Sequence, residues 1–309
     1  MSRVLPIAVV QAQPQKIDEP LSSFSEHAQS LLKSFPQTRM IVYPELHLFH
    51  ADLNKQALLE LAEPLTGPRV SGLRELAGDL GVWLIPGSVC ELGAGGELFN
   101  TALALSPEGQ LVASYRKVFP WRPYEPFDAG DRFVTFDLPG IGRFGFSICY
   151  DAWFPEVTRH LAWMGAEVVL NLVKTTTCDR TQEVVLARAN AIVNQVFVVS
   201  VNCAGPVGTG QSLIVDPEGL VRTATAGAEA TVLTDVLDLE HVARVRKYGT
   251  AGLTRVWDQF RSGDQPLELP LYGGRIDPQR WHLLRVTESP SGLESAAKPA
   301  KATRPKGML

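Results

Sequence analysis

The sequence predicts an α/β fold built on mixed β-sheets, and three observations support this class. Short runs rich in Val, Ile and Leu recur along the chain, and runs that are apolar almost throughout indicate strands buried on both faces. Amphipathic helical stretches lie between these runs. Pairs of apolar runs joined by Pro/Gly turns indicate antiparallel hairpins beside the helix-covered strands. The expected buried strands are 5–12, 39–45, 82–88, 166–173 and 196–202.

The helices and hairpins follow from local patterns. Helices are expected over 21–35, 71–81 and 181–195. The first presents Phe24, Ala28, Leu31 and Leu32 on one stripe, and the last presents Val184, Val185, Ala189 and Ile192. Hairpins are expected over 101–117, 132–149 and 212–224, where Pro and Gly occupy the turns.

Composition excludes several classes of protein. The 309 residues are 45% hydrophobic, enough for one large core or two modest ones. The net charge is −4, and no basic stripe with interleaved aromatic residues indicates nucleic-acid binding. No apolar run reaches the roughly 18 residues of a membrane helix. The start of the chain reads as a strand rather than a signal peptide, and the four cysteines are widely spaced, so we expect reduced thiols and a cytoplasmic location.

The expected domain organisation is simple. We expect one catalytic domain over 1–287, because no linker composition appears before about residue 265. The stretch 288–309 is rich in Ser, Ala, Pro and Lys, which is typical of a flexible tail or an arm laid on a neighbouring subunit.

One segment, "FGFSICYDAWFPE" over 144–156, carries the first chemical signal. Cys149 closes an apolar strand, and Pro155 and Glu156 are typical of a helix start. A thiol near a helix N-terminus is expected to have a lowered pKa and to act as a nucleophile. The alternative is a small buried hydrophobic residue, the usual role of a lone cysteine.

Three charged residues lie in comparable places. Glu45 ends the run 39–45 and is a candidate base, Lys117 ends a hairpin strand, and Glu125 lies in the Pro-rich loop that follows. Taken singly, each is equally explained as a solvated loop acid or a surface lysine. Because strand ends of α/β sheets often converge on one crevice, we expect Glu45, Lys117 and Cys149 to meet.

These segments resemble the signature regions of the nitrilase superfamily, the carbon–nitrogen hydrolases. The likeness lies in "YPE", "YRKVFPW" and "ICYDAWFPE", with supporting similarity in "LFNTALALSPEG", "NQVFVVSVN" and "GQSLIVDPEG", and it covers roughly residues 4–250. It implies a Glu45–Lys117–Cys149 triad and a four-layer α-β-β-α sandwich with two mixed sheets. The spacing of Glu125 and Gly130 further resembles the amidase and formamidase branch, where a second glutamate lies five positions before a glycine. The resemblance also implies dimers or larger homo-oligomers that pair through the helices flanking the nucleophile.

The sequence departs from the family pattern at three places that concern the substrate. Many members have Arg where this chain has Trp153, and many have Glu where it has Val193. The Trp-Glu pair that follows the cysteine in true nitrilases is missing here. These departures favour an amide over a nitrile and remove one possible clamp for a substrate carboxylate.

The resemblance implies a thioester mechanism. Glu45 would take the Cys149 proton, and Lys117 with the Tyr150 backbone N–H would stabilise the oxyanion. Trp121 and Trp153 are candidate walls of a small pocket, and Lys174 is a candidate clamp for a carboxylate, although packing or solvent exposure explains each equally well. We expect a small neutral amide, with ω-amide acids, N-carbamoyl acids and acyl transfer as alternatives. No metal or other cofactor is expected, since "ELHLFH" lacks the HExxH spacing.

Overall fold

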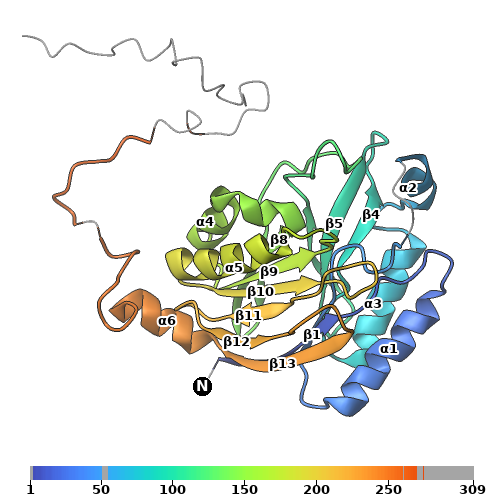
Figure 1. Cartoon of the computed structure of the whole chain (residues 1–309), viewed down its shortest axis with the longest axis horizontal. Coiled ribbons are helices and arrows are strands. Elements are labelled where there is room, and N and C mark those ends of the chain that lie inside the picture. The colour runs from blue at the N-terminus through green and yellow to red at the C-terminus, as the bar shows by residue number, and fades with distance from the viewer. Residues whose placement is uncertain (1–2, 51–54, 260, 270–273, 275–309) are drawn as a thin grey trace, which may run out of the picture. The chain divides into compact units, whose positions relative to one another are not determined.

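The computed structural model describes residues 3–50, 55–259, 261–269 and 274 (Figure 1). The chain divides into two units, Met1–Gln259 and Phe260–Leu309, and every helix and strand named below belongs to the first. The expected tail at 288–309 and the expected domain boundary at 287 lie outside the described residues.

The first sheet has seven strands in the order β13-β1-β2-β3-β5-β4, with β6 paired to β5. Strands β1, β2 and β3 run parallel, whereas β13, β4, β5 and β6 are joined by antiparallel pairs. The strands are β1 (Val4–Gln11), β2 (Met40–Val42), β3 (Trp83–Ile85), β4 (Ser88–Leu92), β5 (Leu98–Leu105), β6 (Leu111–Arg116) and β13 (Thr231–Asp238).

The second sheet has six strands in the order β12-β11-β10-β9-β8-β7. Strands β8, β9 and β10 run parallel, and hairpins complete both edges. The strands are β7 (Thr135–Leu138), β8 (Gly142–Ile148), β9 (Val168–Val173), β10 (Phe197–Asn202), β11 (Leu213–Val215) and β12 (Val221–Ala224). Both sheets are therefore mixed, as the sequence predicts.

Side-chain alternation along the strands produces four layers. Ile7 and Val9 of β1 face the second sheet, whereas Ala8 and Val10 face a helix layer. Helices α1 (Leu21–Ser34) and α3 (Pro68–Leu80) cover the first sheet, and α4 (Pro155–Trp163) and α5 (Arg180–Asn194) cover the second (Figure 1). The remaining helices are α2 (Lys55–Leu61) and α6 (Leu239–Tyr248). The expected α-β-β-α sandwich is confirmed.

The prediction for the buried face of α5 is wrong. Val185 is 64% exposed and Ile192 is 45% exposed, although the sequence placed both on the inward stripe with Val184 and Ala189. The buried residues of α5 are Arg180, Glu183, Ala187, Asn190, Ala191 and Asn194. Polar side chains tolerate this burial because they find partners inside, as when Asn190 donates to the Ala152 carbonyl at 3.2 Å.

Helix α4 buries Val157 and Leu161, whereas Met164 follows its last turn and is 38% exposed. Across the described residues, every helix is too short or too polar to cross a membrane.

Candidate active site

The structure brings Glu45, Lys117 and Glu125 into direct contact beside Cys149. Glu45 follows β2, Lys117 follows β6, and Cys149 follows β8 as the first residue of the 3₁₀ helix η1 (Cys149–Trp153). The Lys117 ammonium lies 3.0 Å from Glu45 and 2.8 Å from Glu125. The charges of all three residues act on the pKa of the Cys149 thiol. The ends of β2, β6 and β8 therefore lie close together, as the sequence predicts.

Glu45 is a buried carboxylate, and one of its oxygens accepts two hydrogen bonds. Its side chain is 2% exposed, and Oε1 accepts hydrogen bonds from Asn100 Nδ2 at 2.7 Å and from Lys117 Nζ at 3.0 Å. The chain just before Glu45 packs closely against Gly87. The φ of Gly87 is +91°, and a Cβ there would lie 1.9 Å from the Pro44 carbonyl oxygen, so this approach requires glycine. Burial raises the pKa of Glu45, the Lys117 charge opposes this, and the Glu125 charge adds to it. A carboxylate with a raised pKa is suited to take and return a proton.

Lys117 is completely buried, and two carboxylates occupy its donors. Its ammonium contacts Glu45 Oε1 at 3.0 Å, Glu125 Oε1 at 2.8 Å and Glu125 Oε2 at 2.9 Å. Burial alone would favour the neutral amine, but the carboxylates of Glu45 and Glu125 outweigh it and raise the pKa of Lys117. Lys117 is therefore a cation at a fixed point.

Glu125 reaches Lys117 from a loop that returns to the end of β6. The Trp121 backbone N–H donates to Glu125 Oε2 at 3.0 Å, and the Glu125 N–H donates back to the Trp121 carbonyl at 2.8 Å. Gly130 closes the loop by donating to the Lys117 carbonyl at 2.8 Å. A Cβ at Gly130 would lie 2.2 Å from the Arg116 carbonyl oxygen, so this close return requires glycine.

Cys149 lies on a strained turn that a buried carboxylate holds in place. Its φ is +47°, a left-handed conformation that non-glycine residues rarely adopt. Asp151 accepts hydrogen bonds from the Ile148 N–H at 2.9 Å, the Phe119 N–H at 2.9 Å and the Tyr115 hydroxyl at 2.8 Å. Because Tyr115 lies on β6 and Ile148 on β8, Asp151 connects the turn at Cys149 to the strand that Lys117 follows. Burial raises the pKa of Asp151 to about 6.

The expected lowering of the Cys149 pKa is wrong. Burial and the Glu45 carboxylate raise the pKa of this thiol well above its usual value, and Lys117 offsets only part of the shift. Helix η1 is a single short 3₁₀ turn, and two glutamates face the sulfur as well. These effects favour the thiol form of Cys149 over the thiolate.

The four candidate substrate-binding residues lie in different surroundings. Tyr150 is half-buried, with its ring 6.2 Å from Trp153 and edge-on to Phe154 at 5.4 Å. Among the described residues, the buried Trp153 Nε1 has no hydrogen-bond partner. Trp121 is half-buried against Tyr124, with ring centroids 4.4 Å apart.

Lys174 is mostly enclosed rather than directed to solvent. Its ammonium donates to the Phe49 carbonyl at 3.1 Å, and burial lowers its pKa. The salt bridges that the structure describes include none to Lys174. The charges of Glu45 and Glu125 nevertheless act on its pKa and partly oppose the effect of burial.

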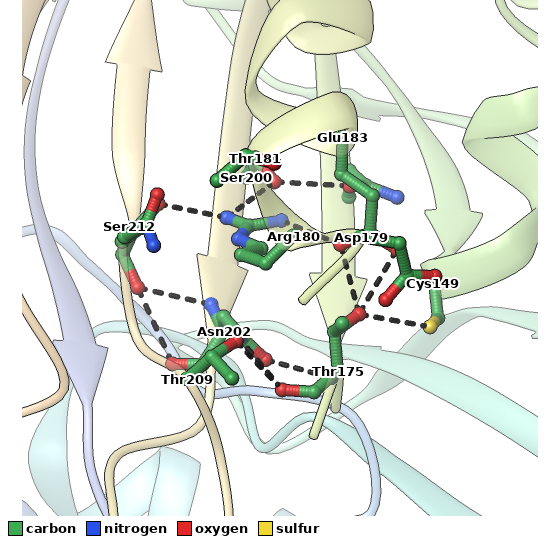
Figure 2. Close-up of polar contacts among 12 residues, drawn as sticks. Cys149, Thr175, Asp179, Arg180, Thr181, Glu183, Ser200, Asn202, Thr209 and Ser212 are labelled. Carbon is green, nitrogen blue, oxygen red and sulfur yellow. Dashed lines mark hydrogen bonds and ion pairs between the residues drawn. The ribbon is translucent and has the colours of Figure 1, made fainter. Parts of the chain in front are cut away.

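Sequence reasoning missed a group of polar residues around the site. Asn100 holds both Glu45 and Lys117, since its carbonyl also accepts the Lys117 backbone N–H at 2.9 Å. A detectable signal existed there, because an asparagine interrupts the apolar run "LFNTALAL". Thr175, Arg180 and Glu183 form a second network against Cys149 (Figure 2), and the polar run "KTTTCDRTQE" does not single them out.

The described residues form no cluster of metal-ligating side chains. Within residues 3–50, 55–259, 261–269 and 274, no three His, Cys, Asp or Glu side chains gather as a metal site would require. The chemistry that the described groups can supply is a nucleophilic thiol, a carboxylate that exchanges protons and a fixed cation.

Comparison with known proteins places the chain in a family. The family model for carbon-nitrogen hydrolases matches residues 6–247. A formamidase from Bacillus thuringiensis (strain Al Hakam) is 31% identical over 201 residues, which are 65% of this chain and 60% of that protein. The match thus spans about three fifths of the length of this curated relative.

Two solved structures show the same architecture. Nit3 from Saccharomyces cerevisiae, a member of branch 10 of the nitrilase superfamily, superposes with a TM-score of 0.72 at 26% identity, over 79% of this chain and 94% of Nit3. An amidase of the nitrilase superfamily from Nesterenkonia AN1, solved as a cysteine-to-alanine mutant, gives a TM-score of 0.67 at 26% identity, over 80% and 95% of the two chains. The protein is thus a member of the carbon–nitrogen hydrolase family.

Proposed function

We propose that this protein is an amidohydrolase that cleaves the carbon–nitrogen bond of a small amide through a thioester on Cys149. The observation that carries the proposal is the packing of Glu45, Lys117 and Glu125 beside a thiol on a strained turn. The similarity to a formamidase and to an amidase supports amide hydrolysis as the reaction class.

The first half of the reaction forms the thioester. The Cys149 sulfur attacks the amide carbon while its proton passes to Glu45, so that a tetrahedral oxyanion forms as the thiol is lost. Glu45 Oε1 already accepts two hydrogen bonds, so Oε2 is the oxygen that takes the proton. When the carbon–nitrogen bond breaks, Glu45 gives this proton to the leaving amine, and ammonia departs.

The second half releases the acid. Water attacks the thioester carbon and gives a proton to Glu45. The carbon–sulfur bond then breaks, and the proton returns to the Cys149 sulfur. The products are a carboxylic acid and ammonia, and the enzyme regains its starting state.

Lys117 can serve the oxyanion only when one of its hydrogen bonds is released. In the resting site all three contacts of its ammonium go to carboxylate oxygens. Protonation of Glu45 neutralises one of these partners, which frees a donor at the moment the oxyanion appears. The Tyr150 backbone N–H, at the start of η1, is the second proposed donor. Each such donor lowers the activation barrier by about 3 kcal/mol.

The proposed substrate class is short neutral amides. A substrate carboxylate would need a cation in the pocket, because an unpaired buried carboxylate is heavily penalised. Trp153 stands where many relatives hold Arg, and its indole offers no charge. We propose that Trp153 and Trp121 bound the acyl side of the pocket.

One observation favours acids as a second candidate. Lys174 is a mostly buried residue whose ammonium donates to the Phe49 carbonyl rather than to a carboxylate. If it faces the substrate, ω-amide acids or N-carbamoyl acids become the natural class.

Ammonia release from purified protein tests the function. A panel of formamide, acetamide, propionamide, a glutaric acid monoamide and an N-carbamoyl amino acid separates the two substrate classes, with Cys149→Ala as the control. We expect the neutral amides to have the higher kcat/KM and Lys174→Ala to preserve that order. A tenfold preference for the acids, about 1.4 kcal/mol, that disappears in Lys174→Ala would identify Lys174 as the clamp. The absence of ammonia from every compound would overturn the hydrolase proposal. Formation of an acylated product from an added amine would show instead that an amine replaces water as the acyl acceptor.

A further inference from the structure

A second carboxylate network reaches Cys149 from α5, apart from the Glu45–Lys117–Glu125 cluster. The Cys149 sulfur lies 3.7 Å from the Thr175 hydroxyl oxygen, within the range of a sulfur hydrogen bond (Figure 2). Thr175 follows β9, the strand beside β8, and is 6% exposed. The same hydroxyl oxygen lies 2.9 Å from Glu183 Oε1 and 2.8 Å from Glu183 Oε2.

Glu183 forms a buried ion pair with Arg180. Arg180 Nη1 lies 3.1 Å from Glu183 Oε2, and the side chains are only 1% and 4% exposed. The guanidinium is anchored further by the carbonyls of Gly210 and Gln211 and by the Ser200 hydroxyl. Because an arginine remains protonated in a protein, its buried charge requires the carboxylate beside it.

This pairing fixes the direction of the Thr175 hydrogen bonds. An ionised carboxylate only accepts hydrogen bonds, so the single hydroxyl hydrogen of Thr175 points to Glu183. The oxygen lone pairs that remain face Cys149, and the contact at 3.7 Å is therefore a thiol S–H that donates to Thr175. Turning the hydroxyl toward the sulfur would remove its hydrogen from a buried carboxylate, which is costly.

We propose that Thr175 is a positioning residue that holds the resting Cys149 in its thiol form, and that Glu183 and Arg180 set the polarity of this contact. A thiolate at the same place would face oxygen lone pairs and a nearby carboxylate. The contact thus keeps the free enzyme unreactive until a bound substrate draws the proton toward Glu45.

Other charged groups also act on this sulfur, and the test must separate them. Glu45, Lys117 and Glu125 approach from the first sheet and its loops, and Glu183 and Arg180 approach from α5. Substitutions at Thr175 leave all five charges in place, so they report on the hydroxyl group, through its contacts with Cys149 and Glu183.

The experiment is alkylation of the intact protein by iodoacetamide across a pH series, quantified for the Cys149 peptide by mass spectrometry. The readout needs no substrate, so it stands apart from the proposed hydrolase activity. The exposed Cys178 provides an internal reference in every reaction. We expect Thr175→Val to react about threefold faster or more at neutral pH, because the thiol form loses its acceptor, and Thr175→Ser to restore the wild-type profile.

Glu183→Gln extends the test to the carboxylate. The amide can donate to Thr175, which frees the hydroxyl to donate to a thiolate, so we expect about tenfold faster alkylation, equivalent to a fall of about one unit in the thiol pKa. Glu108→Gln, an exposed carboxylate in the β5–β6 turn, is the matched control and should behave as wild type. If loss of the Arg180 partner prevents folding, Thr175→Val still decides, because it leaves the ion pair intact. Slower alkylation in Thr175→Val would make the hydroxyl a donor to the thiolate, and an unchanged rate would remove it from the site; either result overturns the proposal.

Discussion

Both carboxylate oxygens of Glu125 accept hydrogen bonds from the Lys117 ammonium, at 2.8 and 2.9 Å. Glu45 holds the same ammonium through one oxygen at 3.0 Å. The buried Lys117 ammonium therefore donates to two oxygens of Glu125 and to one oxygen of Glu45. The single contact is the easier one to release, which supports the proposal that Glu45 exchanges protons while Glu125 anchors the ammonium.

The first prediction concerns the shape of the cation. Lys117→Arg should lower kcat/KM by at least about a hundredfold, because a planar guanidinium cannot place its hydrogens where a fully enclosed ammonium does. Steady-state ammonia release measures this effect. Lys33→Arg, an exposed position on α1, is the control. Near-normal turnover by Lys117→Arg would remove the oxyanion role.

The second prediction concerns the anchor. Glu125→Gln replaces one of the two accepting oxygens with an NH₂ group that faces an ammonium, so Lys117 should shift toward Glu45. We expect kcat to fall by one to two orders of magnitude, since a lost preorganised contact of this kind is worth about 2–3 kcal/mol. Glu108→Gln removes an exposed charge and should keep the wild-type kcat; an equal loss in both variants would return Glu125 to an ordinary loop acid.

The third prediction concerns the covalent intermediate. Rapid acid quenching during turnover should reveal an acyl adduct on Cys149 by intact and peptide mass spectrometry. Cys90 and Cys203 are buried, so neither should carry the adduct. Cys178 is exposed and provides the control for non-specific acylation. Full turnover by Cys149→Ala would exclude the thioester.

The fourth prediction concerns self-association. Trp163 on α4 is 77% exposed and Val185 on α5 is 64% exposed, so apolar side chains face outward on the two helices beside the nucleophile. We propose that a second copy covers this face in a two-fold dimer. Sedimentation at micromolar concentration should give about twice the 33.8 kDa chain mass. Val185→Asp should shift the protein toward the monomer, whereas Val112→Asp, at a residue 43% exposed on β6, should leave the dimer intact. A wild-type monomer would contradict the proposal.

The fifth prediction concerns acid stability. His47 is 2% exposed, its Nδ1 has no hydrogen-bond partner among the described residues, and burial, with the charges of His27 and Lys174, lowers its pKa to about 3. The unfolded chain protonates this histidine near pH 6.5, so its contribution is complete above that pH and is lost as the pH falls toward 3. Between pH 7 and pH 4 the free energy of unfolding should fall by about 3 kcal/mol on this account.

His47→Phe removes that dependence. The ring lies between Phe24 and Tyr43, at centroid distances of 5.8 and 4.8 Å, so a phenyl ring fits the same surroundings. Urea unfolding at pH 7 and pH 4 should show a smaller loss in His47→Phe than in wild type, while the exposed His160→Phe keeps the wild-type loss. An unaltered loss in His47→Phe would mean that other groups dominate acid unfolding.

Much of the fold was predictable because hydrophobic periodicity decides which segments become strands. The buried strands β1, β9 and β10 lie where the apolar runs predict them, and the three hairpins turn at their Pro/Gly signals. The same logic pointed to Glu45, Lys117 and Cys149 as residues at strand ends, although β2 and β6 are separated by β3 and β5 in one sheet and β8 lies in the other. Motif resemblance supplied the order of the layers, which periodicity alone does not determine.

The rest depends on tertiary partners that a single sequence does not display. On α5 the apolar stripe faces outward and the stripe with Arg180, Glu183 and Asn190 is buried, because these polar groups find partners on Thr175, Ser200 and η1. The direction of the Cys149 pKa failed for a related reason. A helix start suggested stabilisation of a thiolate, but burial and the charges of Glu45, Glu183 and Glu125 prevail once the chain is folded.

The pairing of β1 with β13 has a consequence for synthesis of the chain on the ribosome. All eight residues of β1 pair with Thr231–Asp238, and the Gln11 side chain donates to the Gly227 carbonyl, 216 positions away along the chain. One long edge of β1 therefore remains without its neighbour until nearly the whole catalytic unit has emerged. An apolar strand with an open edge is a template for intermolecular pairing. Nascent or truncated chains that stop before β13 should consequently be prone to intermolecular pairing along this edge, a hazard set by topology rather than by overall stability.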